Sequence, residues 1–68
     1  MKLKYLSMIR ENISVWNEWR KRNPTIIPNL QATDFKKLNL DGINFSRVLL
    51  QDADLRKVSL VKANLSGA

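Results

Sequence analysis

Serine hydroxyls are the first groups in this sequence that could act as nucleophiles. A serine needs a neighbouring general base, most often histidine, and the chain contains no histidine. It also contains no cysteine, so disulfides and thiolate metal sites are absent. Gly42 and Gly67 are isolated and form no glycine-rich phosphate loop. We therefore predict no enzyme activity, no cofactor and no metal site. The serines considered are Ser14, Ser46, Ser59 and Ser66.

Charge is the remaining chemical feature of the chain. Twelve Lys or Arg residues stand against six Asp or Glu residues, which gives a net charge of +6. A charge balance of this kind bears on partners and solubility rather than on fold, and here it weakly favours anionic partners. With 68 residues, the chain is at most one small domain. No run of about twenty apolar residues predicts a membrane span, and the basic N-terminus lacks the apolar core of a signal peptide.

These side chains are positioned by a repeat with a period of five residues. A Leu or Phe occupies every fifth position, and a second, mostly apolar position lies two residues before each of them. A helix would show spacings of three and four, and a strand a spacing of two. The period of five therefore indicates a repeat architecture. The series, which we predict to be the core ladder, is Leu30, Phe35, Leu40, Phe45, Leu50, Leu55, Leu60 and Leu65.

The geometry of the repeat follows from which side chains must be buried. Side chains two residues apart point to the same side of an extended chain, so each repeat is a short extended piece followed by a bend. One repeat cannot bury its own apolar pair, but stacked coils can. Four repeats per coil place residue n under residue n+20. The large residues at the second apolar position, such as Ile43 and Val48, predict widened corners.

The repeat resembles the pentapeptide-repeat family, whose pattern is A-(D/N)-L-x-x. The resemblance covers residues 28–68 and rests on eight blocks in phase: P-N-L-Q-A, T-D-F-K-K, L-N-L-D-G, I-N-F-S-R, V-L-L-Q-D, A-D-L-R-K, V-S-L-V-K and A-N-L-S-G. The preceding W-N-E-W-R-K-R-N-P-T-I-I-P is similar to the leader of some bacterial members. The resemblance implies an all-β solenoid, a right-handed quadrilateral β-helix of two coils, in a bacterial protein. A cytoplasmic location is our expectation.

We divide the chain into an N-terminal segment, residues 1–27, and a repeat domain, residues 28–68. Within the first segment, the pattern of residues 3–22 predicts a single amphipathic α-helix. Apolar residues at spacings of three and four form one face. Pro24 disfavours helical geometry at Asn23, so the helix should end there. We expect this helix to cap the open end of the first coil. The alternatives are that this face binds a partner helix or a membrane surface. We expect that it does not bind a membrane. The predicted cap residues are Leu6, Ile9, Ile13, Trp16 and Trp19.

The twenty-residue coil predicts one strongly basic side. We call Lys36, Lys37, Arg56 and Lys57 the basic wall, and Asp34 should stack near Asp54 beside it. A solvated face that prevents edge pairing is the preferred interpretation; the alternative is a docking patch for an acidic protein or for phosphate. The two aspartates would form a solvated ladder, not an acid–base dyad. Leu49 and Val61 are apolar where the pattern expects polar residues, which makes them candidate contacts.

The predicted function is a non-enzymatic interaction or assembly module. The last repeat is in phase and no capping segment follows it within the sequence, so the partner should be another protein or another copy at the C-terminal coil. A chain cut from a longer solenoid is the alternative. Nucleic-acid binding through the basic wall and Arg20, Lys21 and Arg22 is less favoured. Some relatives inhibit type II topoisomerases as acidic DNA mimics, which the net charge of +6 disfavours.

Overall fold

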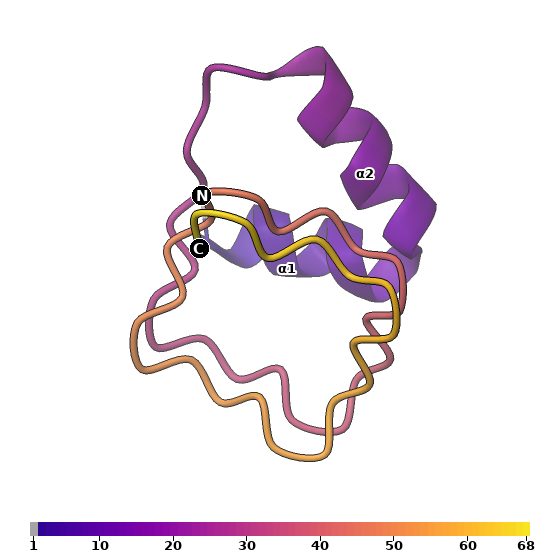
Figure 1. The fold of residues 1–68 in the computed structure, drawn as a ribbon, viewed down its shortest axis with the longest axis vertical. Helices are drawn as coiled ribbons and strands as arrows, with labels where there is room; N and C mark the ends of the chain where they lie inside the picture. Colours follow the sequence, from indigo (N-terminus) through magenta and orange to yellow (C-terminus); the bar gives the residue numbers. More distant parts are fainter. Residues whose placement is uncertain (1) are drawn as a thin grey trace.

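The computed structural model describes residues 2–68, which form two short helices followed by two stacked coils (Figure 1). Helix α1 spans Lys2–Glu11 and helix α2 spans Ile13–Arg22. We call residues 28–47 the first coil and residues 48–67 the second coil. Each coil has four sides, which we number in chain order. Side 1 contains residues 28–32 and 48–52, side 2 contains 33–37 and 53–57, side 3 contains 38–42 and 58–62, and side 4 contains 43–47 and 63–67.

The prediction of one helix over residues 3–22 is wrong, because the helix is interrupted at Asn12. The backbone of Asn12 is extended (φ −172°, ψ 136°), and its side-chain oxygen accepts a hydrogen bond from the Ser14 N–H at 2.8 Å. Asn is a preferred N-cap residue because it satisfies one of the free N–H groups of a helix start. The break divides the segment into two shorter helices that pack against each other, instead of one helix about 30 Å long.

The corners of the coils are set by a left-handed residue at every fifth position. Gly42 and Gly67 have φ of +76° and +73°, and non-glycine residues hold the remaining corners at similar angles. At each corner an N–H donates to the C=O three residues earlier, as Leu38 does to Phe35 at 3.0 Å. A positive φ at the third of four residues is what a type II turn requires. The non-glycine corner residues are Ala32, Lys37, Arg47, Asp52, Lys57 and Lys62.

Backbone hydrogen bonds connect the two coils in parallel register. Four isolated parallel bridges join Asn29 to Leu49, Asp34 to Asp54, Asn39 to Ser59, and Asn44 to Asn64. Residue n therefore lies against residue n+20, and Figure 1 shows the two coils following the same path. Residues 2–68 contain these single bridges and no strand longer than one residue. The stacked coils expected of the solenoid are therefore present, but continuous β-strands are not. A corner every five residues leaves room for one bridging residue per side.

The hydrophobic core lies inside the first coil and against the helices. Trp16 and the four Leu or Phe residues of the first coil are fully buried. An aromatic series runs from the helices into the coil: the Trp16 and Phe45 rings lie 5.9 Å apart edge-to-face, and the Phe45 and Phe35 rings 5.6 Å apart. Such contacts add to the stability that apolar burial provides. The core is therefore a shared one, built by both parts of the chain.

Candidate interaction surfaces

The two helices cover one end of the first coil, and we call α1 and α2 together the lid. Of the predicted cap residues, Trp16 and Ile9 are buried, while Leu6, Ile13 and Trp19 are partly buried and pack against the core. Tyr5, which the sequence analysis did not single out, is 6% exposed and lies 5.8 Å from the Trp16 ring. Its spacing of four from Ile9 was the signal that could have placed it on the buried face.

Polar side chains of α2 bind backbone groups of side 4 and of the adjoining corner at Gly42. The Asn17 side-chain oxygen accepts from the Asn44 N–H at 2.8 Å, and its nitrogen donates to the Gly42 C=O at 3.0 Å. The Trp16 indole N–H donates to the Asn44 C=O at 2.8 Å. The Asn17 side-chain oxygen and the Trp16 indole N–H thus take the places of the C=O and N–H groups that a further coil would offer to Asn44. Buried backbone groups need such partners, so α2 is fixed in position on the coil.

Arg20 belongs to the lid and not to a basic surface. It is 4% exposed, and its guanidinium donates to the Asn44 C=O at 3.2 Å and to the Ser46 C=O at 2.8 Å. Burial, together with the nearby charge of Arg47, lowers the pKa of Arg20. Placing Arg20 with Lys21 and Arg22 in a nucleic-acid patch was therefore wrong. The spacing of four from Trp16 could have placed it on the buried face.

The predicted core ladder separates into two groups. Leu30, Phe35, Leu40 and Phe45 of the first coil are 0% exposed. Their second-coil counterparts Leu50, Leu55 and Leu60 are only partly buried. Leu65 is 42% exposed, so the structure contradicts its place in the core. All four second-coil leucines have a neighbouring coil on one side only, and Leu65 is the one among them that does not pack against the core cluster.

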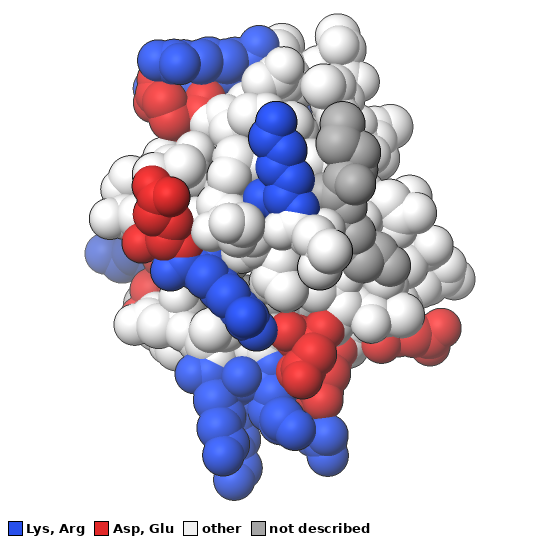
Figure 2. Space-filling model, turned by 180° about the vertical axis from the view of Figure 1, so that it is seen from behind, with Lys and Arg blue, Asp and Glu red and all other residues white. Residues whose placement is uncertain are grey.

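The basic wall is exposed, but part of its charge is neutralised within the wall. Arg56 binds the Asp54 carboxylate through two nitrogens, at 3.0 and 2.9 Å. This pairing, with the Arg56 N–H and the charge of Lys36, lowers the pKa of Asp54 to about 2. Counting Asp34 and Asp54 against the four cations leaves a net charge of +2 on this side. Figure 2 shows Lys and Arg side chains gathered at the lower end of that view, with acidic side chains beside them.

The two apolar candidate contacts lie on opposite sides of the second coil. Leu49 is 43% exposed on side 1, and Val61 is 60% exposed on side 3. The coil therefore separates them and does not combine them into one patch. Beside Val61, the Asp41 carboxylate accepts from the Val61 N–H at 2.9 Å and from the Ser59 hydroxyl. Side 3 is thus held by side-chain bonds between the coils in addition to its backbone bonds.

A second group of backbone polar atoms lies at the end of the molecule opposite the lid. On side 2, the Phe35 N–H donates to the Asp54 C=O at 2.9 Å, the Lys37 N–H to the Arg56 C=O at 3.1 Å, and the Asp54 N–H to the Thr33 C=O at 2.8 Å. Sides 1, 3 and 4 repeat this pattern. The equivalent groups of the second coil face away from the first coil, and we call them the open edge.

The open edge contains more donors than acceptors. Within residues 2–68, none of its groups makes a hydrogen bond to another backbone group. Unpaired N–H and C=O groups in a row form a template for pairing with another chain. The donors are the N–H groups of Leu50, Asp52, Leu55, Lys57, Leu60, Lys62, Leu65 and Gly67, and the acceptors are the C=O groups of Val48, Ala53, Val58 and Ala63.

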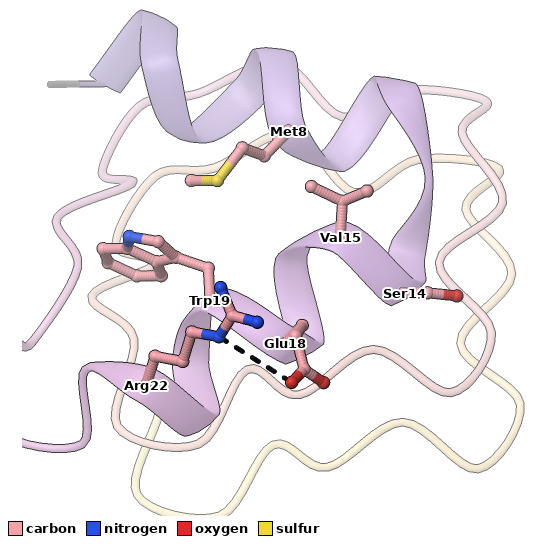
Figure 3. A pocket seen from close by; sticks show the side chains of 6 residues that line it. All are labelled: Met8, Ser14, Val15, Glu18, Trp19 and Arg22. Atoms are coloured by element: carbon pink, nitrogen blue, oxygen red, sulfur yellow. Dashed lines mark ion pairs between the residues drawn. The ribbon is translucent and has the colours of Figure 1, made fainter.

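A shallow groove separates the two helices of the lid (Figure 3). Met8 of α1 faces Trp19 and Val15 of α2 across it, and the Glu18–Arg22 ion pair, at 3.9 Å, lies along its rim. Both partners of that pair are more than half exposed, so its contribution to stability is small. Ser14 is the remaining lining residue, and the groove contains no histidine that could activate it. The groove is therefore lined by apolar side chains between the helices, with the ion pair at its rim.

The described residues contain no group of three or more His, Cys, Asp or Glu side chains that could hold a metal ion. The helices within residues 2–68 are α1 and α2, and neither has the length and apolar character needed to cross a membrane.

Comparison with curated proteins and with solved structures gave no significant match. A comparison with protein-family models matched residues 29–67 to pentapeptide repeats, in eight copies. The match agrees with the observed geometry, in which a corner recurs every five residues and four corners complete a coil. It also confirms the resemblance that the eight sequence blocks indicated. The chain belongs to the pentapeptide-repeat family.

Proposed function

We propose that this protein is a non-enzymatic interaction module that associates with a second copy of itself through the open edge. Residues 28–68 would then act as a right-handed quadrilateral β-helix that presents a rigid end surface. One observation carries the proposal: the second coil leaves a full set of backbone donors and acceptors unpaired beside half-buried leucines. The other end of the coils is covered by the lid, so pairing through the open edge gives a closed dimer and not a fibre.

The lid strengthens this proposal because it supplies hydrogen-bond partners on side 4 that the open edge lacks. On side 4, Trp16, Asn17 and Arg20 bind the outward backbone groups of the first coil. The open edge lacks any such partner among residues 2–68. Proteins usually protect sheet edges with a cover, a charge or a bulge. An inward-facing Leu at position 65 on an uncovered edge is what an interface requires, and it is costly in a monomer.

The experiment that tests self-association is sedimentation of the 68-residue chain over a wide concentration range. We expect a monomer–dimer equilibrium, and we expect Leu65→Lys to abolish the dimer because it places a charge at the open edge. Val61→Lys is the matched control, since the Val61 side chain is 60% exposed and the Val61 N–H is bound by the Asp41 carboxylate of the first coil. A folded chain that stays monomeric at every concentration refutes the proposal.

Nucleic-acid binding through the basic wall is the second candidate function. The four exposed cations and the total charge of +6 favour it, while the Asp54–Arg56 pair and the buried Arg20 weaken it. Phosphate contacts by Lys and Arg make affinity fall steeply with salt. A titration with mixed-sequence DNA at low and high salt is the test. Binding that disappears in Lys36→Gln/Lys37→Gln/Lys57→Gln would favour this function over self-association alone.

A further inference from the structure

The lid covers the apolar interior of the first coil but binds its backbone only at side 4 and the adjoining corner. On side 4, three backbone groups point away from the second coil: the Asn44 N–H, the Asn44 C=O and the Ser46 C=O. Asn17 accepts from the Asn44 N–H, and Trp16 and Arg20 donate to the Asn44 C=O. Arg20 also donates to the Ser46 C=O. Side 4 therefore shows what a partner of this end must supply, which is an acceptor and a larger number of donors.

Side 2 has the same three outward groups, at Asp34 and Lys36. The N–H and C=O groups of one trans peptide unit point in opposite directions. The Thr33 C=O, the Phe35 N–H and the Lys37 N–H all bind the second coil, at 2.8, 2.9 and 3.1 Å. The Asp34 N–H, the Asp34 C=O and the Lys36 C=O therefore point toward the lid end, and we call these three groups the side-2 edge.

The side-2 edge has no hydrogen-bond partner within residues 2–68. The Lys36 N–H does not belong to it, because the Asp34 carboxylate already binds that N–H at 2.9 Å. Asp34 and Lys36 are both exposed, and in Figure 1 side 2 lies at the lower end of the coils, on the opposite side from α2. Unpaired backbone groups along an edge are a template for an added strand.

We propose that the side-2 edge binds an extended, acidic peptide segment of a partner protein as an added β-strand. The strand supplies to Asp34 and Lys36 the acceptor and the donors that α2 supplies to Asn44 and Ser46 on side 4. The lid fills the interior at this end, so a whole coil cannot stack there, but a single strand can pair along one side. This site lies on the first coil and is independent of self-association through the open edge.

Charge favours an acidic strand on side 2. The side has a net charge of +2, and Lys36 and Lys37 of the basic wall are exposed directly beside the side-2 edge. Figure 2 shows Lys and Arg side chains projecting at the lower end of the molecule, where side 2 lies. Complementary charge attracts an acidic segment to this side and disfavours a basic one.

The other two sides that α2 leaves unbound lack one of these features. Side 3 has the same unpaired groups at Asn39 and Asp41, but its one acid and one base, Asp41 and Lys62, cancel. On side 1 the Gln31 C=O accepts from the Thr33 hydroxyl at 3.4 Å, and that side carries one acid and no base. Side 2 therefore combines unpaired backbone groups with an excess of positive charge.

The lid also limits which side chains the added strand can carry. Successive side chains of a strand alternate between two faces. One face of the added strand looks outward, as Lys36 does, and the other looks toward the interior, where Thr33 and Phe35 are 5% and 0% exposed. Because the lid and the second coil already fill that interior, the inward side chains must be small. The ligand is therefore a segment in which acidic residues alternate with Gly, Ala or Ser.

A peptide of about eight residues, alternating Glu and Ala and blocked at both ends, is the probe. Successive N–H groups of a strand point to opposite neighbours, so N-methylation at every Ala blocks the donors on one edge and N-methylation at every Glu blocks those on the other. We expect one methylated peptide to bind the full chain like the parent and the other to bind about tenfold more weakly or not at all. Equal behaviour of the two methylated peptides overturns the added strand.

Hydrogen exchange locates the peptide on the coil. In the free protein the Asp34 and Asn39 amides should exchange fast and the Asn44 amide slowly, because Asn17 binds only the last of them. Saturating peptide should slow exchange at Asp34 by about tenfold and leave Asn39 unchanged. Protection at Asn39 in place of Asp34, or at neither residue, overturns the assignment to side 2.

Charge variants provide an independent readout. Lys37→Gln should weaken binding of the parent peptide about twofold to fivefold, the range expected for an exposed ion pair, and added salt should weaken binding as well. Lys62→Gln is the matched control, because Lys37 and Lys62 are both exposed corner residues with left-handed φ, 67° and 58°, and Lys62 lies on side 3. Equal losses in the two variants contradict the site.

The outcomes separate this inference from the functions proposed above. A mixed-sequence DNA that binds through the basic wall, with no protection of the Asp34 amide by the peptide, favours nucleic-acid binding and overturns the added strand. Sedimentation reports on the open edge and peptide binding on the side-2 edge, so the failure of one leaves the other intact.

Discussion

The first and second coils contain the same repeat and bury it to different extents. Phe35 and Leu40 of the first coil are fully buried, whereas their counterparts Leu55 and Leu60 are only partly buried. The first coil has a neighbour on both faces, the lid and the second coil. The second coil has a neighbour on one face only. In this fold, therefore, the burial of a residue depends less on its own type than on how many layers contact its coil.

Among substitutions that compare the covered and uncovered ends of the coils, the largest loss of stability should come from Trp16. This residue is fully buried and joins the lid to the first coil through both its ring and its indole N–H. Trp16→Ala should cost about 3–5 kcal/mol in unfolding free energy, enough to unfold much of so small a domain. Chemical denaturation followed by circular dichroism measures it. An unchanged midpoint would mean that the lid does not belong to the core.

The next largest change in unfolding free energy should come from a pair of equivalent leucines, one in each coil. Leu40→Ala should cost about 2–5 kcal/mol because Leu40 is fully buried, and Leu60→Ala should cost clearly less. Denaturation of both variants at low protein concentration compares them. Equal losses would show that the second coil is covered in solution. If the difference disappears as concentration rises, the cover is a second copy of the chain.

Asn17 tests how much the polar contacts of the lid contribute. Asn17→Ala removes partners from the Asn44 N–H and the Gly42 C=O together and should cost about 1–3 kcal/mol. The Asn44 amide should then exchange its hydrogen with solvent much faster, which NMR can follow. The Asn64 amide, which donates to the Ile43 C=O between the coils, serves as the internal control.

Corner residues should respond alike in both coils, because their strain is a property of the backbone. Lys37 and Lys57 have φ of 67° and 60°. A left-handed conformation costs a non-glycine residue about 1–2 kcal/mol, and glycine loses about 0.5–1 kcal/mol of that gain through chain entropy. Lys37→Gly and Lys57→Gly should each stabilise by roughly 0.5–1 kcal/mol. Unequal melting shifts would indicate that the two coils differ in more than burial.

The smallest effect is the pH dependence of the Asp54–Arg56 pair on the second coil. The pKa of Asp54 is lowered to about 2, so the pair stabilises the folded state above the ordinary carboxyl range, near pH 4. This stabilisation is lost as the pH falls from about 4 through about 2. NMR titration of the Asp54 carboxyl should give a midpoint near 2. In Arg56→Gln the midpoint should move up toward the ordinary value, and if it does not, the pair is absent in solution.

Sequence reasoning predicted the register of the coils and a helical cap on the first coil, but not the break within that cap. The period of five from Leu30 onward placed residue n beside n+20, and four bridges have that spacing. The pattern is readable because each repeat meets the same neighbours. The break at Asn12 was missed because apolar spacing continues across it; only the preference of Asn for N-caps pointed there.

The burial of Arg20 was missed for a related reason. Its partners are backbone C=O groups more than twenty residues away, and no side-chain pattern reveals them. The exposure of Leu65 was missed because its repeat has the same pattern as the others. Its exposure depends on its position in the second coil and not on its residue type. The periodic part of the chain could be predicted because its contacts repeat, whereas the lid depends on contacts that occur once.

The uniform register also determines how the chain can reach this fold. The first bridge must close a loop of about twenty residues, which costs roughly 2.7 kcal/mol in chain entropy by the logarithmic law, apart from a constant. Once Asn44 meets Asn64, for example, the bridge from Asn39 to Ser59 needs only five more residues on each chain segment. Folding should therefore consist of one slow closure followed by rapid zippering from side to side. The rate of that single closure would set the folding time of the whole molecule.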